Sequence, residues 1–487
     1  MAASVEEHSH GHAPNRFGVL PAAERLNADA TLSGRGVTIA FLDSGFLRHP
    51  DLTQPENRIL AFHDASSPSA RLEEDRPAEP SDWHGTQTCV VAAGNGHLSG
   101  GLYRGLAHES RVVLVKVGEK GRIREEHIAS GLEWVLAQRE RYGIRIVSIS
   151  LGGDEDAPLE VNTVNMLAEE AVRRGLVVVV AAGNAGCTPM HRPVPPATAP
   201  SVITVGGYDD GNDPEGKMLT LYCSSFGATA DGLAKPEIIA PAAGVAAPIL
   251  PGTPAYRRAE VLSRLAAEPD VLLARSLRKL AAGDPALSRL EGPTPGQTRV
   301  RIEEALLSEK IVATHYQHVD GTSFAAPIVA SVVAQMLEVN STLTPAAVKH
   351  LLVTTADRVT GAPAVRQGHG MLCARRAVEA ARREAHGAVG TFFAGPRVEN
   401  GRVVFTYHDD VARIVELAGE FNGWDPRRAA FEQVSGGVWR ITLDAPSAGR
   451  YRYKLLVDGE RWVEDPGNGA KEPDPYGGFD SVLRIES

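Results

Sequence analysis

The stretch "HVDGTSFAAPIVASVVAQML", from His318 to Leu337, places the small polar group Gly-Thr-Ser directly before a long apolar run. Apolar residues occupy every helical spacing from Ala325 onward, which predicts a buried helix with Pro327 in its first turn. Ser323 would then lie at a helix N-terminus, where unpaired N–H groups and the helix dipole stabilise a negatively charged oxygen. A serine in this position is either an ordinary N-cap or a nucleophile whose substrate becomes an oxyanion.

Short apolar runs alternate with helical patterns between Gly36 and Gly207. Runs rich in Val and Ile are typical of strands buried on both faces of a parallel sheet; here they are "GVTIAFLD", "RVVLVKVG", "IRIVSISLGG", "GLVVVVAAGN" and "SVITVGG". The stretches "EEHIASGLEWVLAQRERYG" and "VNTVNMLAEEAVRRGL" between them have the pattern of crossover helices. The alternation predicts a three-layer α/β/α domain with a mainly parallel sheet.

Two further regions break this pattern. Residues 249–315 are charged and rich in Ala and Leu, which predicts a helical insertion split by Pro269 and by Gly283 to Pro285. Over residues 396–487, apolar and polar residues alternate in short runs between turn residues, which predicts an immunoglobulin-like antiparallel β-sandwich. We therefore expect a tail over residues 1–16, a main domain over residues 17–388 and a second domain over residues 396–487.

The composition is that of an ordinary globular protein. Of the 487 residues, 43% are hydrophobic and 23% charged, and the net charge of −10 disfavours nucleic acid and membrane as partners. The start, "MAASVEEHSHGHAPNRF", lacks the features of a signal peptide, and we predict no membrane span, so we expect a cytoplasmic protein. No CxxC spacing occurs, and we expect free thiols at Cys89, Cys187, Cys223 and Cys373.

Four polar residues lie where predicted strands end or helices begin. Asp43 ends a buried strand, His84 opens the small-residue helix "HGTQTCVVAAG", and Asn184 follows the run "VVVVAAG". Taken singly, each has an ordinary role as a cap, a core histidine or a turn residue. Together with Ser323 they supply a carboxylate, a base, an amide donor and a hydroxyl, which are the groups that acyl transfer needs.

The motifs around these residues resemble those of the subtilisin-like serine proteases, over about residues 17–385. They are "FLDSGFLRHPDL", "HGT", "SLGG", "AAGN", "KPEIIAP" and "GTSFAAP", in the order Asp, His, Ser that this family has, and the intracellular bacterial members are the most similar. The resemblance implies that Ser323 is the nucleophile, His84 the base and Asp43 its orienting partner. The Asn184 amide and the Ser323 N–H would hold the oxyanion.

The resemblance also implies a substrate groove. Ser150, Leu151 and Gly152 would form one edge and Gly118 of "VGEKGRI" the other, so that a peptide lies between them as an added strand. Gly183 would border the same groove.

Within that groove, Val194 would lie near the base of the pocket for the residue that precedes the scissile bond, which predicts a preference for small or medium apolar side chains. We expect no cofactor. Asp51 matches one carboxylate of a calcium loop found in secreted relatives, and a structural calcium stays open as an alternative, although "GNGHLSGGL" does not carry that loop.

The segments "ELAGEFNGWDPRRAAFEQV" and "YRYKLLVDGERWVEDP" of the second domain resemble carbohydrate modules of the glycogen-binding and isoamylase N-terminal type. The resemblance implies that Trp424 and Trp462 form a stacking platform with Lys454 beside it, and that α-glucan is a second partner. The alternative is a structural appendage whose tryptophans belong to the core.

These observations predict a serine endopeptidase that acts on proteins or peptides through an acyl-enzyme. The alternative from another class is a catalytically silent scaffold that binds glycan or protein. An esterase of the α/β-hydrolase type is disfavoured, because there is no G-x-S-x-G motif and the order of the three residues differs. No HExxH motif occurs, which disfavours a zinc protease.

Overall fold

The computed structural model describes residues 19–67, 69–73, 76–119, 121–153, 156–213, 219–281, 284–384, 395–399, 401–409, 412–435, 437–468, 470–476 and 478–485. The predicted tail, residues 1–16, lies outside the described residues, as do residues 385–394, which hold the predicted end of the main domain and most of the connection to the second domain.

A parallel sheet forms the centre of the main domain, with the strand order β12-β8-β7-β6-β1-β3-β2 and the short antiparallel β9 beside β8. The bounds are β1 Thr38–Asp43, β2 Ile59–Asp64, β3 Arg111–Lys116, β6 Ile144–Ile149, β7 Val177–Ala181, β8 Ile203–Asp209, β9 Thr220–Leu221 and β12 Ile238–Pro241. The five predicted strands are all present. Two strands were not predicted: β2, which is half-buried at the sheet edge, and β12, which has only four residues.

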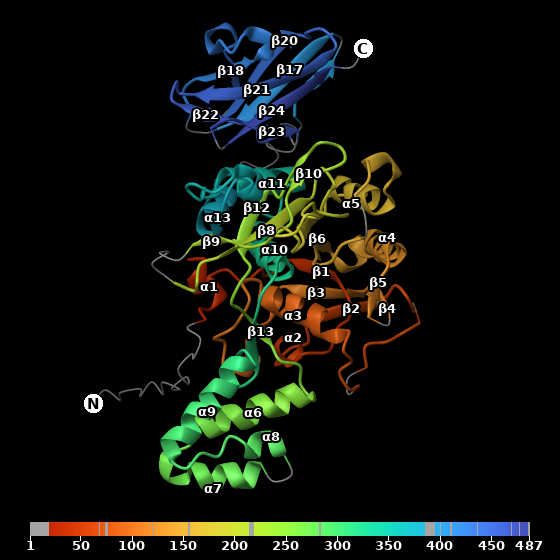
Figure 1. Cartoon of the computed structure of the whole chain (residues 1–487). Helices are drawn as coiled ribbons and strands as arrows, with labels where there is room; N and C mark the ends of the chain where they lie inside the picture. Colours follow the sequence, from red (N-terminus) through yellow and green to blue (C-terminus); the bar gives the residue numbers. More distant parts are fainter. Residues whose placement is uncertain are drawn as a thin grey trace, which may run out of the picture.

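Helices cover both faces of this sheet and complete the predicted three layers (Figure 1). Helices α3 (Asp82–Ala93), α10 (Thr322–Val339) and α13 (Ala374–Arg383) pack on one face, and α4 (Glu125–Tyr142) and α5 (Thr163–Arg173) on the other. In β1, Ile39 and Phe41 belong to the first core, and Ala40 and Leu42 to the second. This period-two alternation explains why the strand is apolar throughout.

Helix α10 runs through the core beneath the sheet. It contacts β6, β7, β8 and β12 as well as α3 and α13. No apolar segment of membrane length was expected from the sequence. This helix of 18 residues is long and apolar enough to cross a membrane, by length and composition only, but 83% of it is buried inside the main domain. A core helix of this kind is apolar all round because protein surrounds it on every side.

A bundle of helices lies between β13 (Val245–Pro248) and β14 (Ile311–Ala313), and we call it the insertion (Figure 1). Its helices are α6 Pro254–Ala267, α7 Asp270–Leu280, α8 Pro285–Ser288 and α9 Pro295–Ser308. Prolines open three of them and Pro269 precedes the fourth, as expected where N–H groups need no partner. The insertion has its own apolar core, against which Trp83 packs from the residue before His84.

Two antiparallel sheets form the second domain, which we call the module. One has the order β16-β17-β20-β19, and the other β18-β21-β24-β23 with β22 beside β21. The bounds are β16 Arg397–Glu399, β17 Arg402–His408, β18 Val415–Gly419, β19 Glu432–Ser435, β20 Val438–Asp444, β21 Gly449–Val457, β22 Arg461–Val463, β23 Lys471–Pro473 and β24 Phe479–Ile485. Side chains of both sheets share one core, including the buried Trp439 and Tyr453, so the module is the predicted sandwich.

Helix α11 (Pro345–Thr354) also packs in the first core. Shorter helices and strands of the main domain are α1 Ala22–Arg25, α2 Pro50–Thr53, β4 Gly118–Glu119, β5 Arg122–Ile123, β10 Gly227–Ala228, β11 Ala234–Lys235, β15 Tyr316–Val319 and α12 Ala364–Gln367. The β10–β11 hairpin reaches the module, where Leu233 forms a β-bridge with Ala470.

Candidate active site

Asp43 and His84 form a hydrogen-bonded pair at the end of β1. The two residues meet because α3 begins at Asp82, beside the carboxyl end of the strand. Nδ1 of His84 lies 2.7 Å from Oδ1 of Asp43, which is 1% exposed. The negative charge of Asp43 raises the pKa of His84, while burial opposes this effect. With Nδ1–H donating to the carboxylate, the neutral imidazole carries its lone pair on Nε2, the nitrogen available to act as a base.

Ser323 is the second residue of α10, and the helix begins three residues earlier than predicted. Pro327 therefore lies in the second turn rather than the first, inside the helix. A proline has no N–H to bond the carbonyl four residues before it, and that carbonyl belongs to Ser323. Instead, Ser150 Oγ donates to Ser323 O at 2.8 Å, so the side chain that follows β6 takes the place of the missing helical bond.

The residue that follows Ser323 lies beside the Asp43–His84 pair. The ring of this residue, Phe324, is 5.9 Å from the His84 ring, centroid to centroid. Among the described residues, Ser323 Oγ donates to the carbonyl of Ser150 at 3.3 Å rather than to His84. Catalytic hydrogen bonds are often long or absent before substrate binds, so this geometry is compatible with a nucleophile.

Asn184 follows β7 and faces the start of α10. Its Oδ1 accepts hydrogen bonds from the N–H of Thr322 at 2.9 Å and from the Thr322 hydroxyl at 3.1 Å. Because the amide oxygen is engaged in this way, the amide NH₂ is the group that is left to donate to a ligand. Gly183 has φ +98°, which favours glycine, and its N–H donates to the same hydroxyl.

The predicted groove residues lie around these groups. Gly153 N donates to Pro195 O at 2.7 Å, which draws the segment after β6 against the segment of Val194. A Cβ on Gly152 would lie 2.6 Å from Val194 Cγ2, so the valine packs directly beside this glycine. Gly118 is in β4, and a Cβ there would lie 2.4 Å from the carbonyl oxygen of Ser44. Leu151 is half-buried and packs against the second core.

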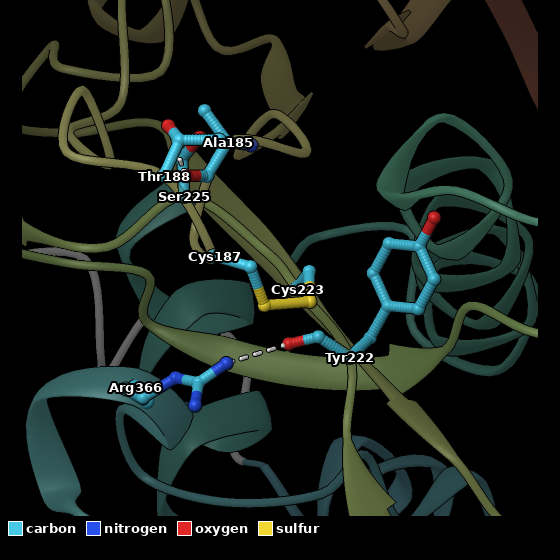
Figure 2. The surroundings of a disulfide bond; sticks show 7 residues. All are labelled: Ala185, Cys187, Thr188, Tyr222, Cys223, Ser225 and Arg366. Atoms are coloured by element: carbon cyan, nitrogen blue, oxygen red, sulfur yellow. Dashed lines mark hydrogen bonds between the residues drawn. A yellow bond between two sulfur atoms is a disulfide. The ribbon is translucent and has the colours of Figure 1, made fainter.

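A disulfide joins Cys187 to Cys223, so the expectation of free thiols is wrong for these two cysteines (Figure 2). Their Cα atoms are 5.3 Å apart because the loop after β7 lies against the segment after β9. Gly186 N donates to Cys223 O at 2.9 Å. The spacing of 36 residues carries no local motif, so only the strand order brings the two thiols together. Cys89 and Cys373 are free.

Hydrogen bonds satisfy the Asp51 carboxylate, which the resemblance linked to calcium. Oδ2 accepts from the Tyr316 hydroxyl at 2.6 Å and Oδ1 from Leu98 N at 3.1 Å, and the residue is fully buried. Within the described ranges, no group of three or more His, Cys, Asp or Glu side chains could hold a metal ion. Both Asp51 oxygens thus have hydrogen-bond partners within the protein.

A cavity of about 1170 Å³ lies between the module and the main domain, and it contains the predicted carbohydrate residues Trp424, Lys454 and Trp462. Trp462 is 48% exposed, in contrast to Trp439 in the module core at 6%. Lys454 forms an ion pair with Asp474. The alternative in which all the tryptophans are core residues therefore does not hold for Trp462.

Two segments of the chain match known protein families. Residues 34–370 match the model described as "Subtilase family", and residues 393–477 match "Carbohydrate-binding module 48 (Isoamylase N-terminal domain)". Serine protease AprX of Bacillus subtilis (strain 168) is 32% identical over 346 residues, which are 69% of this chain and 65% of AprX.

Two shorter matches involve the Major intracellular serine protease of the same strain and Subtilisin BL of Lederbergia lenta. The first is 32% identical over 158 residues, 32% of this chain and 45% of the relative. The second is 31% identical over 187 residues, 37% of this chain and 59% of the relative. The chain thus spans less than two thirds of the length of each of these three relatives.

Proposed function

Since the chain belongs to the subtilase family, we propose that it is a serine endopeptidase that cleaves peptide bonds through an acyl-enzyme intermediate. The observation that carries this proposal is the arrangement of four groups around the N-terminus of α10. The Asp43–His84 pair lies at 2.7 Å, the His84 ring neighbours the residue after Ser323, and Asn184 is bonded to Thr322.

In the proposed reaction, Ser323 Oγ attacks the carbonyl carbon of the scissile bond, and His84 Nε2 takes the hydroxyl proton. Asp43 holds the imidazole and stabilises its positive charge. The carbonyl oxygen becomes negatively charged, and the Ser323 N–H and the Asn184 amide donate to it at the positive end of the helix. The imidazolium then gives its proton to the leaving amine, and a water activated by the same nitrogen releases the acyl group.

The substrate is a protein or peptide chain. We propose that it lies between the Ser150–Gly152 segment and β4, with the side chain before the scissile bond directed toward Val194. The contact between Val194 and Gly152 supports this direction, because it closes the space that a larger side chain would need. Small or medium apolar residues are therefore the preferred ones at this position.

The decisive experiment is labelling with a fluorophosphonate probe together with cleavage of a peptide library. The native chain should be labelled and should cleave, whereas Ser323→Ala should do neither. Ser308→Ala in the exposed end of α9 is the matched control and should behave like the native chain. Labelling that persists in Ser323→Ala would contradict the nucleophile assignment, and a native chain without labelling or cleavage would favour the silent scaffold.

We further propose that the module binds α-glucan. A specific observation favours this second function, since Trp424, Lys454 and Trp462 line one cavity. Pyranose rings stack on exposed indoles, and a cation beside them can hydrogen-bond to hydroxyl groups. Binding of maltoheptaose to the native chain, measured by calorimetry, tests this proposal, and no heat at millimolar sugar would contradict it.

A further inference from the structure

We propose that the glucan site is composite: the main domain forms one wall of it, so that a bound chain contacts both domains at once. This inference rests on the proposed glucan binding and adds to it a partner surface that the module does not itself contain. The cavity that holds Trp424 and Trp462 is also lined by the main-domain segment Arg358–Pro363, which follows α11.

The module supplies the aromatic wall. Besides the two tryptophans, Tyr476 lines the cavity and is 94% exposed. Asp480, on β24, forms an ion pair with Lys454 on the same wall, because its carboxylate lies 3.8 Å from Lys454 Nζ. Burial raises the pKa of Asp480, while Lys454 opposes this effect. Hydroxyl groups of a sugar can donate to such a carboxylate and accept from the ammonium group, and would give this largely buried ion pair further hydrogen-bond partners.

The main-domain wall has a fixed shape. Gln367 of α12 bonds to three backbone atoms of the segment: its Oε1 accepts from Val359 N at 2.8 Å, and its Nε2 donates to the carbonyls of Val359 at 3.1 Å and Ala362 at 2.8 Å. Gln367 is itself buried, at 2% exposure. Thr360 lies on this segment and is exposed. The backbone of the segment is therefore held from behind, while Thr360 is free to face a ligand.

Polar contacts across the domain interface fix the distance between the two walls. Arg358 of the main domain forms an ion pair with Glu464 of the module at 2.8 Å. His369 lies 3.3 Å from Glu464 and 3.0 Å from Lys471 Nζ. These contacts border the cavity, because Arg358 and Glu464 also line it. The cavity is larger than the ~300–1,000 Å³ of common small-molecule sites, so it has room for several sugar units between the walls.

The composite site distinguishes this chain from a module that binds glucan by itself. A sugar that stacks on Trp462 lies within the same cavity as Thr360, and binding therefore depends on both domains. Because ligand binding stabilises the state that binds, glucan also stabilises the docked arrangement of the module on the main domain.

The test is calorimetric titration of the full chain with maltoheptaose, in the native form and in three variants. Trp462→Ala removes a stacking surface of the module. Thr360→Trp fills space from the main-domain side. We expect this variant to bind maltoheptaose about tenfold more weakly, because the indole occupies the place of a sugar. Thr31→Trp, at an exposed threonine remote from the cavity lining, is the matched control and should keep the native affinity.

Each outcome has a defined meaning. A change of more than about threefold in Thr360→Trp, with none in Thr31→Trp, supports the composite site. A smaller change, while Trp462→Ala loses binding, overturns the composite site and leaves glucan binding by the module intact. A native chain that binds no maltoheptaose overturns both. Fluorophosphonate labelling of each variant reports separately whether the main domain is folded, and it tests the proposed peptidase independently of the sugar.

Discussion

Removal of the Cys187–Cys223 disulfide should weaken both the fold and the proposed reaction. The bond closes a loop across a sequence separation of 36 residues. On the chain-entropy model, a loop of this length stabilises the folded state by about 4 kcal/mol, because the cross-link restricts the unfolded chain. The double variant Cys187→Ser/Cys223→Ser, in which neither thiol remains, should lose stability of this order in calorimetric unfolding.

The same variant should also slow the proposed turnover, since the disulfide lies close in the chain to Asn184, the proposed oxyanion donor. Asn184 is three residues before Cys187, and the segment from Gly183 to Cys187 is further held by bonds from Ser225 N to Gly183 O at 2.8 Å and from Ala185 N to Ser225 Oγ at 3.2 Å. Because these bonds stay, we expect kcat to fall by about tenfold, less than the about 10²–10³ that loss of an oxyanion donor costs.

Cys373→Ser, at a free and half-buried cysteine, is the control and should change neither quantity. Unfolding of the double variant within about 0.5 kcal/mol of the native chain would refute the reasoning. Alkylation of the thiols in fresh cell lysate adds a test of compartment. A disulfide found intact would argue against the expected cytoplasmic location, where thiols are usually kept reduced.

Three other predictions concern the pocket, the insertion and the domain interface. Val194→Gly should raise kcat/KM for cleavage after Phe relative to Ala by about tenfold or more, since it opens the space beside Gly152; an unchanged ratio on paired peptide substrates would place the pocket elsewhere. Replacement of residues 254–308 by a short linker should alter peptide preference but keep fluorophosphonate labelling, because the insertion has its own core and none of the proposed catalytic groups; loss of labelling in a folded variant would contradict this. Burial, followed by the charge of Lys471, lowers the pKa of His369 to about 3. The unfolded chain therefore binds a proton at this histidine more readily than the folded chain does. The contribution of His369 to the free energy of unfolding is present above about pH 6.5 and is lost as the pH falls toward 3. Between pH 7 and 5 the native chain should lose about 2 kcal/mol more than His369→Gln in urea unfolding, and equal losses would refute the buried neutral histidine.

The parallel strands could be predicted because a strand that is buried on both faces is a nearly continuous run of apolar residues. The five runs of Val and Ile correspond to β1, β3, β6, β7 and β8. Strand β2 escaped prediction because it lies at the sheet edge and is half-buried, so its pattern is weaker. In the module, the longer strands β17, β20 and β21 show the period-two alternation that predicts the sandwich, whereas β16, β22 and β23 have only three residues each and are too short to show it.

Contacts between distant segments were much less accessible from the sequence. Pro327 was visible, but the carbonyl that it leaves without a helical donor is bonded by Ser150, which is 173 residues away. The disulfide depends in the same way on the order of the strands, and the wall opposite Trp462 comes from a segment about a hundred residues earlier in the chain. Local patterns report burial and propensity, whereas such pairings depend on topology.

The insertion and the module contact different parts of the main domain. Figure 1 shows the insertion and the module at opposite ends of the main domain. The insertion returns to the main domain through β15, which ends four residues before Ser323, and its core contacts Trp83 beside His84. The module instead docks on the segment after α11 and on the β10–β11 hairpin. We therefore expect a change in the insertion to reach the proposed catalytic groups through direct packing, and the proposed glucan binding to act on where the chain is held rather than on the proposed chemistry.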